Sequence, residues 1–144
     1  MFQGEYINNM DDKGRVSIPV AFRDALKMRY DDERFVIARD AFDDCLRAYP
    51  VQEWRHLLDK LSRQPVNNRA VRSFSRRVVS SAVEYAVDKQ GRVLVPHSLR
   101  EHAGLVKSVV FAGMTNCFEI WDEQRWKQEL KESTEILQAS DLDF

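Results

Sequence analysis

Two copies of a short acidic and basic motif carry the clearest chemistry in this sequence. The motif Asp-x-x-Gly-Arg occurs at Asp11–Arg15 and, 77 positions later, at Asp88–Arg92. Its glycine, Gly14 or Gly91, can take the positive φ of a tight hairpin turn, which would place the aspartate across the turn from the arginine. A charge-assisted ion pair there would restrict the rotamers of the arginine side chain before any ligand binds. The guanidinium fork matches O6 and N7 of guanine, so the motif indicates DNA recognition.

A second interpretation is structural, because the aspartate and arginine could simply brace the turn. Two matched copies favour the functional interpretation, and we predict DNA contact through Arg15 and Arg92, held by Asp11 and Asp88. Exposed lysines beside the turns suit phosphate contacts that position a protein without reading sequence. These lysines are Lys13 and Lys89; Gln90 stands at the repeat position of Lys13, so the two loops need not contribute equally.

Other reactive side chains predict no catalytic or metal site. The three histidines share no metal-ligand spacing, and neither a Gly-x-Ser-x-Gly elbow nor a phosphate-binding loop occurs. Cys45 and Cys117 stand at equivalent strand starts, which indicates core positions with reduced thiols. We therefore expect no enzyme, no cofactor and no small-molecule substrate.

The repeat extends beyond the motifs and divides the chain into two similar halves. Pro19 and Pro96 follow the two motifs at the same offset of 77, and Cys45–Trp54 parallels Cys117–Trp126 at an offset of 72. In each half we predict a strand, a hairpin turn at the motif, a second strand, a short helix, two further strands and a longer helix. The predicted ranges are Arg15–Ile18, Val20–Met28, Arg34–Arg39, Cys45–Tyr49 and Pro50–Leu61 in the first half, then Val83–Val87, Arg92–Val95, His97–Ala103, Ser108–Ala112, Cys117–Trp121 and Asp122–Leu137 in the second.

Neither half has enough apolar residues to build a stable core alone. Two halves pairing around a pseudo-twofold axis would close a small barrel, so we predict an α+β fold of two intertwined halves. The expected division is residues 1–64 for the first half, 65–82 for a helical connector and 83–144 for the second half with an acidic tail. Arg23 and Arg100, which repeat one turn into the short helices, are expected to form salt bridges or caps within this barrel.

Charge is balanced overall but unevenly distributed. The chain has 22 Lys and Arg against 23 Asp and Glu, which argues against a diffusely basic nucleic-acid binder. Residues 60–83 hold six basic residues and no acidic one, whereas residues 119–144 hold eight acidic and three basic residues. The basic segment could bind phosphates, bind the acidic tail of a neighbouring subunit, or be a solvated helix face. Neither a signal peptide nor a membrane-spanning apolar run is evident, so we expect a cytoplasmic protein.

The motifs resemble those of the MraZ family, bacterial transcriptional regulators of the division and cell-wall gene cluster. The resemblance covers nearly the whole chain and rests on three stretches: Met1-Phe2-x-Gly4-Glu5-Tyr6, Asp11-x-Lys13-Gly14-Arg15-x-Ser17-Ile18-Pro19, and Asp88-x-Gln90-Gly91-Arg92-x-x-x-Pro96 with Leu99-Arg100.

This resemblance implies AbrB-like swapped-hairpin halves that form a double-split β-barrel with peripheral helices. It also implies ring-shaped homo-oligomers that bind short G-rich direct repeats in double-stranded promoter DNA of the protein's own gene, within the nucleoid. An alternative is an antitoxin-like protein-interaction module, in which the acidic stretch Glu129–Phe144 would fold on a partner.

Overall fold

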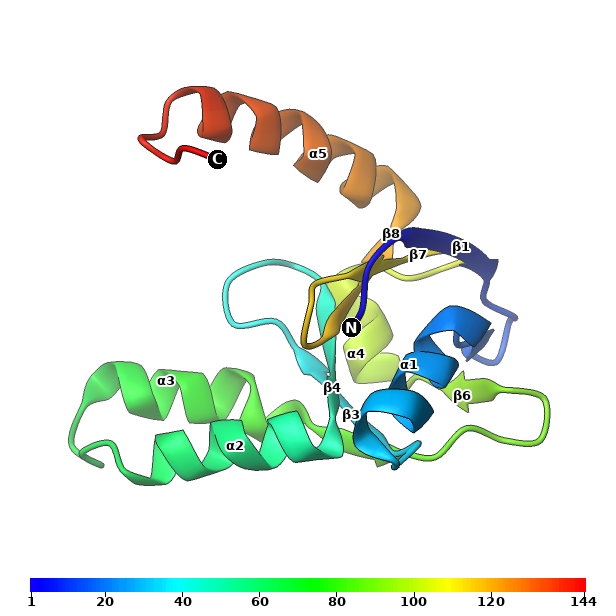
Figure 1. Ribbon diagram of the computed structural model, residues 1–144, viewed down its shortest axis with the longest axis horizontal. Helices are drawn as coiled ribbons and strands as arrows, with labels where there is room; N and C mark the ends of the chain where they lie inside the picture. The colour runs from blue at the N-terminus through cyan, green and yellow to red at the C-terminus, as the bar shows by residue number, and fades with distance from the viewer.

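The computed structural model describes residues 1–144 and shows a mixed α+β architecture with an antiparallel six-stranded sheet and a separate two-stranded ribbon (Figure 1). The first half supplies β1 (Glu5–Asn9), β2 (Arg15–Ser17), α1 (Val20–Tyr30), β3 (Phe35–Arg39), β4 (Leu46–Pro50) and α2 (Val51–Ser62). The connecting segment forms α3 (Arg69–Arg77) and a 3₁₀ turn, η1 (Val79–Ser81). The second half supplies β5 (Val83–Tyr85), β6 (Arg92–Leu94), α4 (His97–Ala103), β7 (Ser108–Gly113), β8 (Phe118–Asp122) and α5 (Glu123–Gln138).

The two halves exchange strands. In the sheet order β1-β7-β8-β4-β3-β5, the first strand of each half pairs with a strand of the other half, as β1 with β7 and β5 with β3. The ribbon joins β2 to β6, and β4 pairs with β8 at the centre of the sheet. Neither half can therefore complete its own sheet, in agreement with the predicted intertwining.

The prediction of a hairpin around each Asp-x-x-Gly-Arg turn is wrong in one respect. Each turn is tight, but the strands on its two sides belong to different sheets: β1 pairs with β7, whereas β2 pairs with β6. The turn geometry is local, whereas ladder partners are set by which apolar faces meet in the core. The motif thus forms a corner between two sheets.

The strand register reveals a pseudo-twofold axis. In the ribbon, Val16 lies opposite Val93, which is its own repeat equivalent at the offset of 77. In the large sheet, Arg47 lies opposite Glu119, its equivalent at the offset of 72. An axis that relates the two halves must pass through such self-paired positions, so it runs through both the ribbon and the β4–β8 pair.

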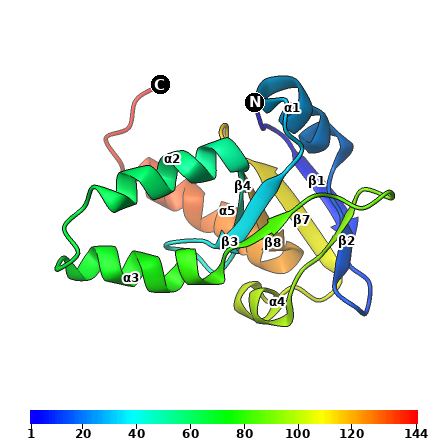
Figure 2. The same ribbon diagram turned by 90° about the horizontal axis from the view of Figure 1, so that it is seen from below.

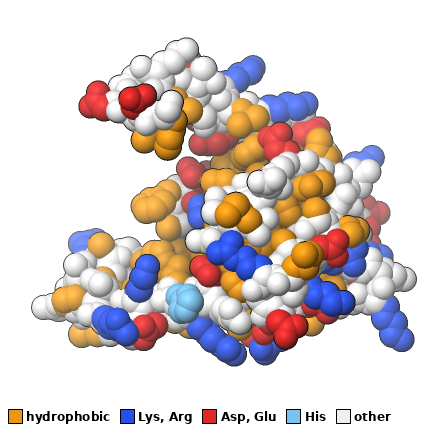
Figure 3. All heavy atoms as spheres, in the orientation of Figure 1, with side chains coloured by type: hydrophobic (Ala, Val, Ile, Leu, Met, Phe, Trp, Pro, Cys, Tyr) orange, Lys and Arg blue, Asp and Glu red, His pale blue; other side chains and the backbone are white.

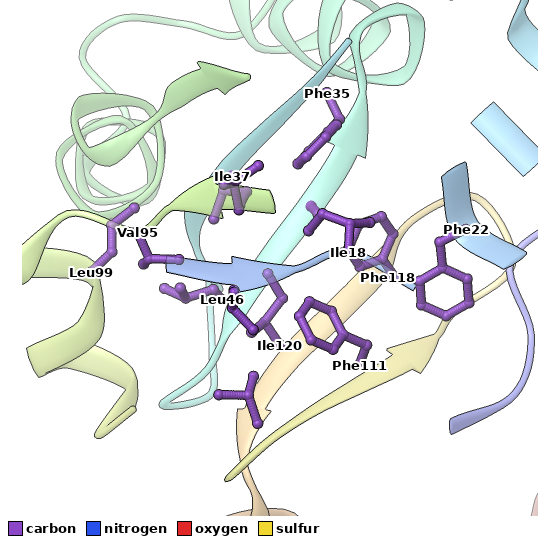
Figure 4. Close-up of a cluster of buried hydrophobic side chains, with 14 of the residues drawn as sticks. Ile18, Phe22, Phe35, Ile37, Leu46, Val95, Leu99, Phe111, Phe118 and Ile120 are labelled. Atoms are coloured by element: carbon purple, nitrogen blue, oxygen red, sulfur yellow. The ribbon is translucent and has the colours of Figure 1, made fainter. Parts of the chain in front are cut away.

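One main core joins the two halves. It contains 20 buried residues drawn from the large sheet, the ribbon and helices α1 and α4. Figure 4 shows Phe22 and Ile18 from the first half packed beside Phe111 and Phe118 from the second. The ring centroids of Phe22 and Phe118 lie 4.8 Å apart. Because burial of such side chains supplies most of the folding free energy, the halves are expected to fold as one unit.

Both short helices begin where the sequence predicts, and α4 also ends there. Pro19 and Pro96 are the N-cap residues of α1 and α4, and Gly104 ends α4 in the left-handed conformation. Helix α1 extends two residues further than predicted and ends at Tyr30, whose side chain is buried. The main differences elsewhere are shifts of one or two residues at element ends.

The two long helices differ more than their repeat relationship predicts. Helix α2 buries Val51 and Trp54 against β3 and β4, whereas α5 buries no residue completely. Two of its leucines, Leu130 and Leu137, are exposed. In Figures 1 and 2, α5 and the α2–α3 hairpin extend from the body of the protein away from the β2–β6 ribbon. None of the helices combines the length and apolar character needed to cross a membrane.

Candidate nucleic-acid interface

The first turn, Asp11–Arg15, is held by a dense set of hydrogen bonds to one carboxylate. Oδ1 of Asp11 accepts hydrogen bonds from the amides of Lys13 and Arg15 at 3.0 and 2.9 Å. Oδ2 accepts one from Nε of Arg15 at 2.7 Å, which completes an ion pair. Since the carboxylate binds only Nε, both terminal Nη groups of Arg15 remain free of protein partners. Asp11 therefore orients the guanidinium of Arg15 and leaves its two Nη groups available to hydrogen-bond a ligand.

The second turn, Asp88–Arg92, has the same backbone but a different side-chain arrangement. Oδ1 of Asp88 accepts hydrogen bonds from the amides of Gln90 and Arg92 at 2.8 and 2.9 Å. The arginine side chain is further away, with 3.5 Å between its Nε and Oδ2 of Asp88. Instead, Nη2 of Arg92 donates to Oε1 of Gln90 at 2.5 Å. Part of this guanidinium's outer edge is therefore already occupied.

These contacts lower the pKa of both aspartates. The amide of Arg15 is the largest cause for Asp11, and with the Arg15 side chain it holds the pKa of this carboxyl at about 2. The amide of Arg92 lowers the pKa of Asp88 in the same way. Both carboxylates are charged at neutral pH, so both turns keep their ion pairs and backbone hydrogen bonds.

The ribbon places both arginines on the same side of the protein. Val16 and Val93 at its centre are buried in the core. Side chains alternate along a strand, so Arg15 and Arg92 lie on the opposite, outward face. They are diagonal neighbours across the ribbon, which places their Cα atoms about 7–8 Å apart. The buried valines thus anchor a surface on which the arginine pair is displayed.

Each turn is also braced by the other half of the molecule. The carbonyl of Gly14 accepts a hydrogen bond from the amide of Val95 at 2.9 Å, and Gly91 accepts one from Ile18 at 2.9 Å. Both glycines have positive φ, 88° at Gly14 and 76° at Gly91. A Cβ on either would lie 2.7 Å from an arginine nitrogen of the opposite half. The backbone conformation therefore favours glycine at both positions, and a side chain at either would also have to displace the opposite arginine.

Those bracing arginines are Arg100, over Gly14, and Arg23, over Gly91. Nε of Arg100 donates to the carbonyl of Val95 at 3.0 Å, whereas Nε of Arg23 is buried without a hydrogen-bond partner. The predicted salt bridges are absent, so that part of the expectation is wrong. Their packing against the opposite turn nonetheless agrees with a structural role.

The lysines predicted to contact phosphates, Lys13 and Lys89, are both exposed at the tips of their turns. The basic segment is not part of this surface: α3 lies at the far end of the molecule from β6 in Figure 1 and from β2 in Figure 2. One of its arginines, Arg77, instead donates to the carbonyls of Asp40 and Asp43 at 2.8 and 3.2 Å. The structure thus brings together the two motifs and their lysines, and leaves α3 apart.

A buried polar cluster at the centre of the large sheet was not predicted. Arg47 forms ion pairs with Asp40 at 2.9 Å and with Glu119 at 2.8 Å, and donates to Sγ of Cys117 at 3.3 Å. Burial raises the pKa of Glu119, while Trp121 donates to its other oxygen at 2.9 Å. The signal was available in the repeat alignment, where Arg47 and Glu119 are equivalent positions of opposite charge.

This cluster also contains the one group with metal-ligand atoms close together. Carboxylate oxygens of Asp40 and Glu119 and the thiol of Cys45 lie within 4.8 Å of one another. Arg47 already forms ion pairs with both carboxylates. Burial raises the pKa of Cys45, which keeps its thiol protonated. These features suit a structural ion-pair network better than a metal site, and both cysteines are buried as predicted.

Fold and site together define a class: a duplicated α+β protein whose interleaved halves display two oriented arginines on one outward ribbon. A family model described as "MraZ protein, putative antitoxin-like" matches residues 1–77 and again residues 78–142. The chain therefore belongs to the MraZ family, and the resemblance inferred from its motifs is confirmed.

Relatives from several bacteria cover almost the whole chain. A protein of Shewanella denitrificans is 42% identical over 142 residues, which are 99% of this chain and 93% of the relative. One from Lactobacillus gasseri is 41% identical over 145 residues, with 99% and 97% covered, and one from Pediococcus pentosaceus is 43% identical over 135 residues, with 94% and 90% covered. All three are named "Transcriptional regulator MraZ". These names describe a regulator and agree with the expectation that the chain is not an enzyme.

Proposed function

We propose that this protein is a sequence-specific DNA-binding transcriptional regulator that reads base edges with Arg15 and Arg92. The observation that carries the proposal is their placement: two oriented guanidinium groups share the outward face of a two-stranded ribbon. The relatives' names support a regulatory role. The protein is proposed to act in the cytoplasm, at the nucleoid.

The dimensions of the ribbon suit the major groove. This groove of B-DNA admits a two-stranded β-ribbon, and arginine is the usual side chain that binds guanine through O6 and N7. A separation of about 7–8 Å between the two arginines corresponds to roughly two base-pair rises of 3.4 Å. One subunit would therefore contact guanines about two steps apart, which fits a short G-rich site.

The turn residues would fix this docking geometry. Asp11 and Asp88 hold the turn backbones and orient the arginines, while Gly14 and Gly91 allow the close approach of the opposite half. Exposed lysines at both turn tips, Lys13 and Lys89, would bind phosphates on the groove walls. No cofactor or metal is needed for this recognition.

One subunit offers too few contacts for tight binding, so we propose that the protein acts as a ring-shaped homo-oligomer. Several equivalent ribbons on a curved array would meet direct repeats in the promoter of the protein's own gene, within the division and cell-wall gene cluster. Linked contacts raise affinity by effective concentration. The strand exchange supports an AbrB-like double-split barrel as the unit of this array, divided at residues 1–64, 65–82 and 83–144.

The direct test is a titration of labelled DNA from the region upstream of the protein's own gene, at two salt concentrations. A scrambled duplex of equal composition is the control. Tight binding to the native sequence, weakened by salt as phosphate contacts are lost, is the expected result. Equal binding to both duplexes, or binding to neither, contradicts the proposal.

A second candidate function is an antitoxin-like protein-interaction module. The family description favours it. So do the apolar side chains of α5, because they are exposed and no other part of the chain buries them. A stoichiometric heterologous partner recovered with the full-length protein, together with no affinity for promoter DNA, would favour this function over the first.

A further inference from the structure

The outward face of the β2–β6 ribbon carries one large apolar side chain, that of Leu94. This side chain is 54% exposed, whereas Val16 and Val93 at the centre of the ribbon are buried. Because side chains alternate along both strands, Leu94 lies on the same face as Arg15 and Arg92. In Figure 3, hydrophobic side chains lie beside Lys and Arg side chains in the region that Figure 1 labels β6. The proposed DNA-binding face is therefore partly apolar.

Leu94 is the direct cross-strand neighbour of Arg15. One position away, the amide of Val95 donates to the carbonyl of Gly14 at 2.9 Å. Hydrogen-bonded and non-hydrogen-bonded pairs alternate in an antiparallel ladder, so Arg15 and Leu94 form a non-hydrogen-bonded pair. Pairs of this kind bring their side chains closest together, with Cβ atoms about 4.5–5.5 Å apart. The apolar side chain thus stands immediately beside the first arginine.

The strand that carries Leu94 is held in place by a hydrogen bond from the large sheet. Oη of Tyr85 donates to the carbonyl of Leu94 at 2.8 Å, and Nδ2 of Asn8 donates to the carbonyl of Ser17 at 2.7 Å. Tyr85 and Leu94 are the repeat equivalents of Asn8 and Ser17 at the offset of 77, so the two hydrogen bonds correspond. Leu94 is therefore exposed on an anchored strand.

The equivalent position in the first half is polar. Ser17 lies opposite Arg92 and is only partly exposed. The two arginines therefore have different neighbours, because an aliphatic side chain flanks Arg15 and a hydroxyl flanks Arg92. An exposed leucine gains free energy when a ligand removes it from water, so its place in the ribbon favours a ligand with an apolar group next to the guanine bound by Arg15.

The major groove displays one apolar group on its base edges, the C5-methyl group of thymine. The other groups there are hydrogen-bond donors and acceptors, which an aliphatic side chain would leave unpaired. A Cβ separation of about 4.5–5.5 Å lies between one and two base-pair rises of 3.4 Å. Leu94 would therefore lie over a base pair that neighbours the one contacted by Arg15.

We infer that Leu94 contacts the C5-methyl group of a thymine next to the guanine bound by Arg15. This inference rests on the proposed function and adds a second base to those that the ribbon reads. At the other arginine, Ser17 makes no methyl contact. Each subunit thus distinguishes thymine at one of its two arginines only.

Deoxyuridine lacks only this methyl group of thymidine, so it tests the contact directly. Fluorescence anisotropy compares two labelled duplexes of the region upstream of the protein's own gene, one natural and one with deoxyuridine in place of every thymidine. The full-length wild-type protein should bind the deoxyuridine duplex roughly fourfold more weakly for each contacted methyl group, as expected when one methyl group is removed from an apolar contact.

Two substitutions of Leu94 should abolish this difference. Leu94→Ala and Leu94→Ser should bind the natural duplex more weakly than the wild type does, and should bind both duplexes with equal affinity. Because the side chain is exposed, its removal leaves no buried cavity, and serine is the residue at the equivalent position of the first half. Circular dichroism and thermal unfolding check the fold of each variant.

Ser17→Ala is the matched control, since it changes the equivalent position beside the other arginine. It should keep the wild-type ratio of the two affinities. That ratio is the decisive measurement, because a general loss of binding weakens both affinities alike.

Equal binding of the two duplexes by the wild type would overturn the inference. So would a wild-type ratio in either Leu94 variant, or a ratio lost equally in Ser17→Ala. In each of these cases, a preference for the natural duplex over the scrambled one would still support the proposed function. Absence of that preference would overturn both.

Discussion

The two Asp-x-x-Gly-Arg turns have the same backbone and present different arginines. In both, one aspartate oxygen accepts two backbone amides, and a glycine with positive φ lies under an arginine of the other half. In the first turn Asp11 holds Nε of Arg15 and leaves both Nη groups free; in the second, Gln90 binds Nη2 of Arg92. The two repeats thus share one turn conformation. The glutamine at position 90 leaves Arg92 fewer free hydrogen-bond donors than Arg15.

The largest expected effect distinguishes the two arginines in DNA binding. Arg15→Ala should weaken binding to promoter DNA by roughly ten- to a hundredfold, since a bidentate arginine–guanine contact contributes about 1–3 kcal/mol. Arg92→Ala should cost less, because part of its fork is already bound to Gln90. Fluorescence anisotropy on the native duplex measures both, with the exposed Lys27→Ala as control. An equal or larger loss for Arg92→Ala would contradict the asymmetry.

The next prediction tests the glycine with positive φ that the two turns share. Gly14→Ala and Gly91→Ala should each lower the free energy of unfolding by about 1–2 kcal/mol, because an L-residue is strained at positive φ. Urea denaturation measures both losses, which should be similar.

Part of each loss in the free energy of unfolding should come from a clash between the new Cβ and the arginine that packs on the turn. A second substitution tests this part separately. Adding Arg100→Ala to Gly14→Ala should cost less than the sum of the single changes, because the new Cβ would otherwise meet Arg100 at 2.7 Å. Strict additivity of the two changes would show that the arginine moves aside freely.

A smaller effect is expected when the difference between the turns is removed. Gln90→Ala releases Nη2 of Arg92, and one hydrogen bond contributes about 0.5–1.5 kcal/mol. Affinity for promoter DNA should rise a few-fold in the same anisotropy assay, and the rise should vanish when Arg92→Ala is also present. A fall in affinity would instead indicate that Gln90 positions Arg92 for contact.

The smallest effect is a lowered acid titration of both aspartates. NMR of the side-chain carboxyl carbons should give Asp11 a midpoint of about pH 2 and Asp88 a midpoint below its ordinary value of 3.8. The folded-state pKa lies below the unfolded one, so this stabilisation is complete above the unfolded value near 3.9 and is lost as pH falls through the folded pKa. Arg15→Ala should leave the midpoint of Asp11 lowered, since the Arg15 amide is its largest cause. A midpoint near 3.8 in the wild type would contradict the turn geometry.

The centre of the large sheet offers a second lesson about duplication. A symmetric pair of identical halves would place the same residue on both sides of the axis at this point. Here Arg47 faces Glu119, and Asp40 completes the network. A buried ion pair across the axis requires two different residues, so the fused chain can build an interaction that two identical halves could not.

Much of the fold could be predicted from the sequence because its signals are local. The glycines of the turns, the prolines before α1 and α4, and the alternation of apolar residues in β2 and β6 specify conformation within a few residues. The offset of 77 between the motifs was enough to predict two intertwined halves, and the motifs themselves indicated the family. The candidate site residues were likewise chosen from residue type and spacing.

The features of the fold that the sequence did not predict depend on contacts between residues distant in the sequence. Which strand pairs with which is decided by the fit of apolar faces in a shared core, so β1 and β2 separated into different sheets. The packing of Arg23 and Arg100 over the opposite turns, the pairing of Arg47 with Glu119, and the exposure of α5 follow from that arrangement. The sequence determined the turns and the residues they display; tertiary packing decided that both arginines share one face, because burial of Val16 and Val93 leaves them no other side of the ribbon.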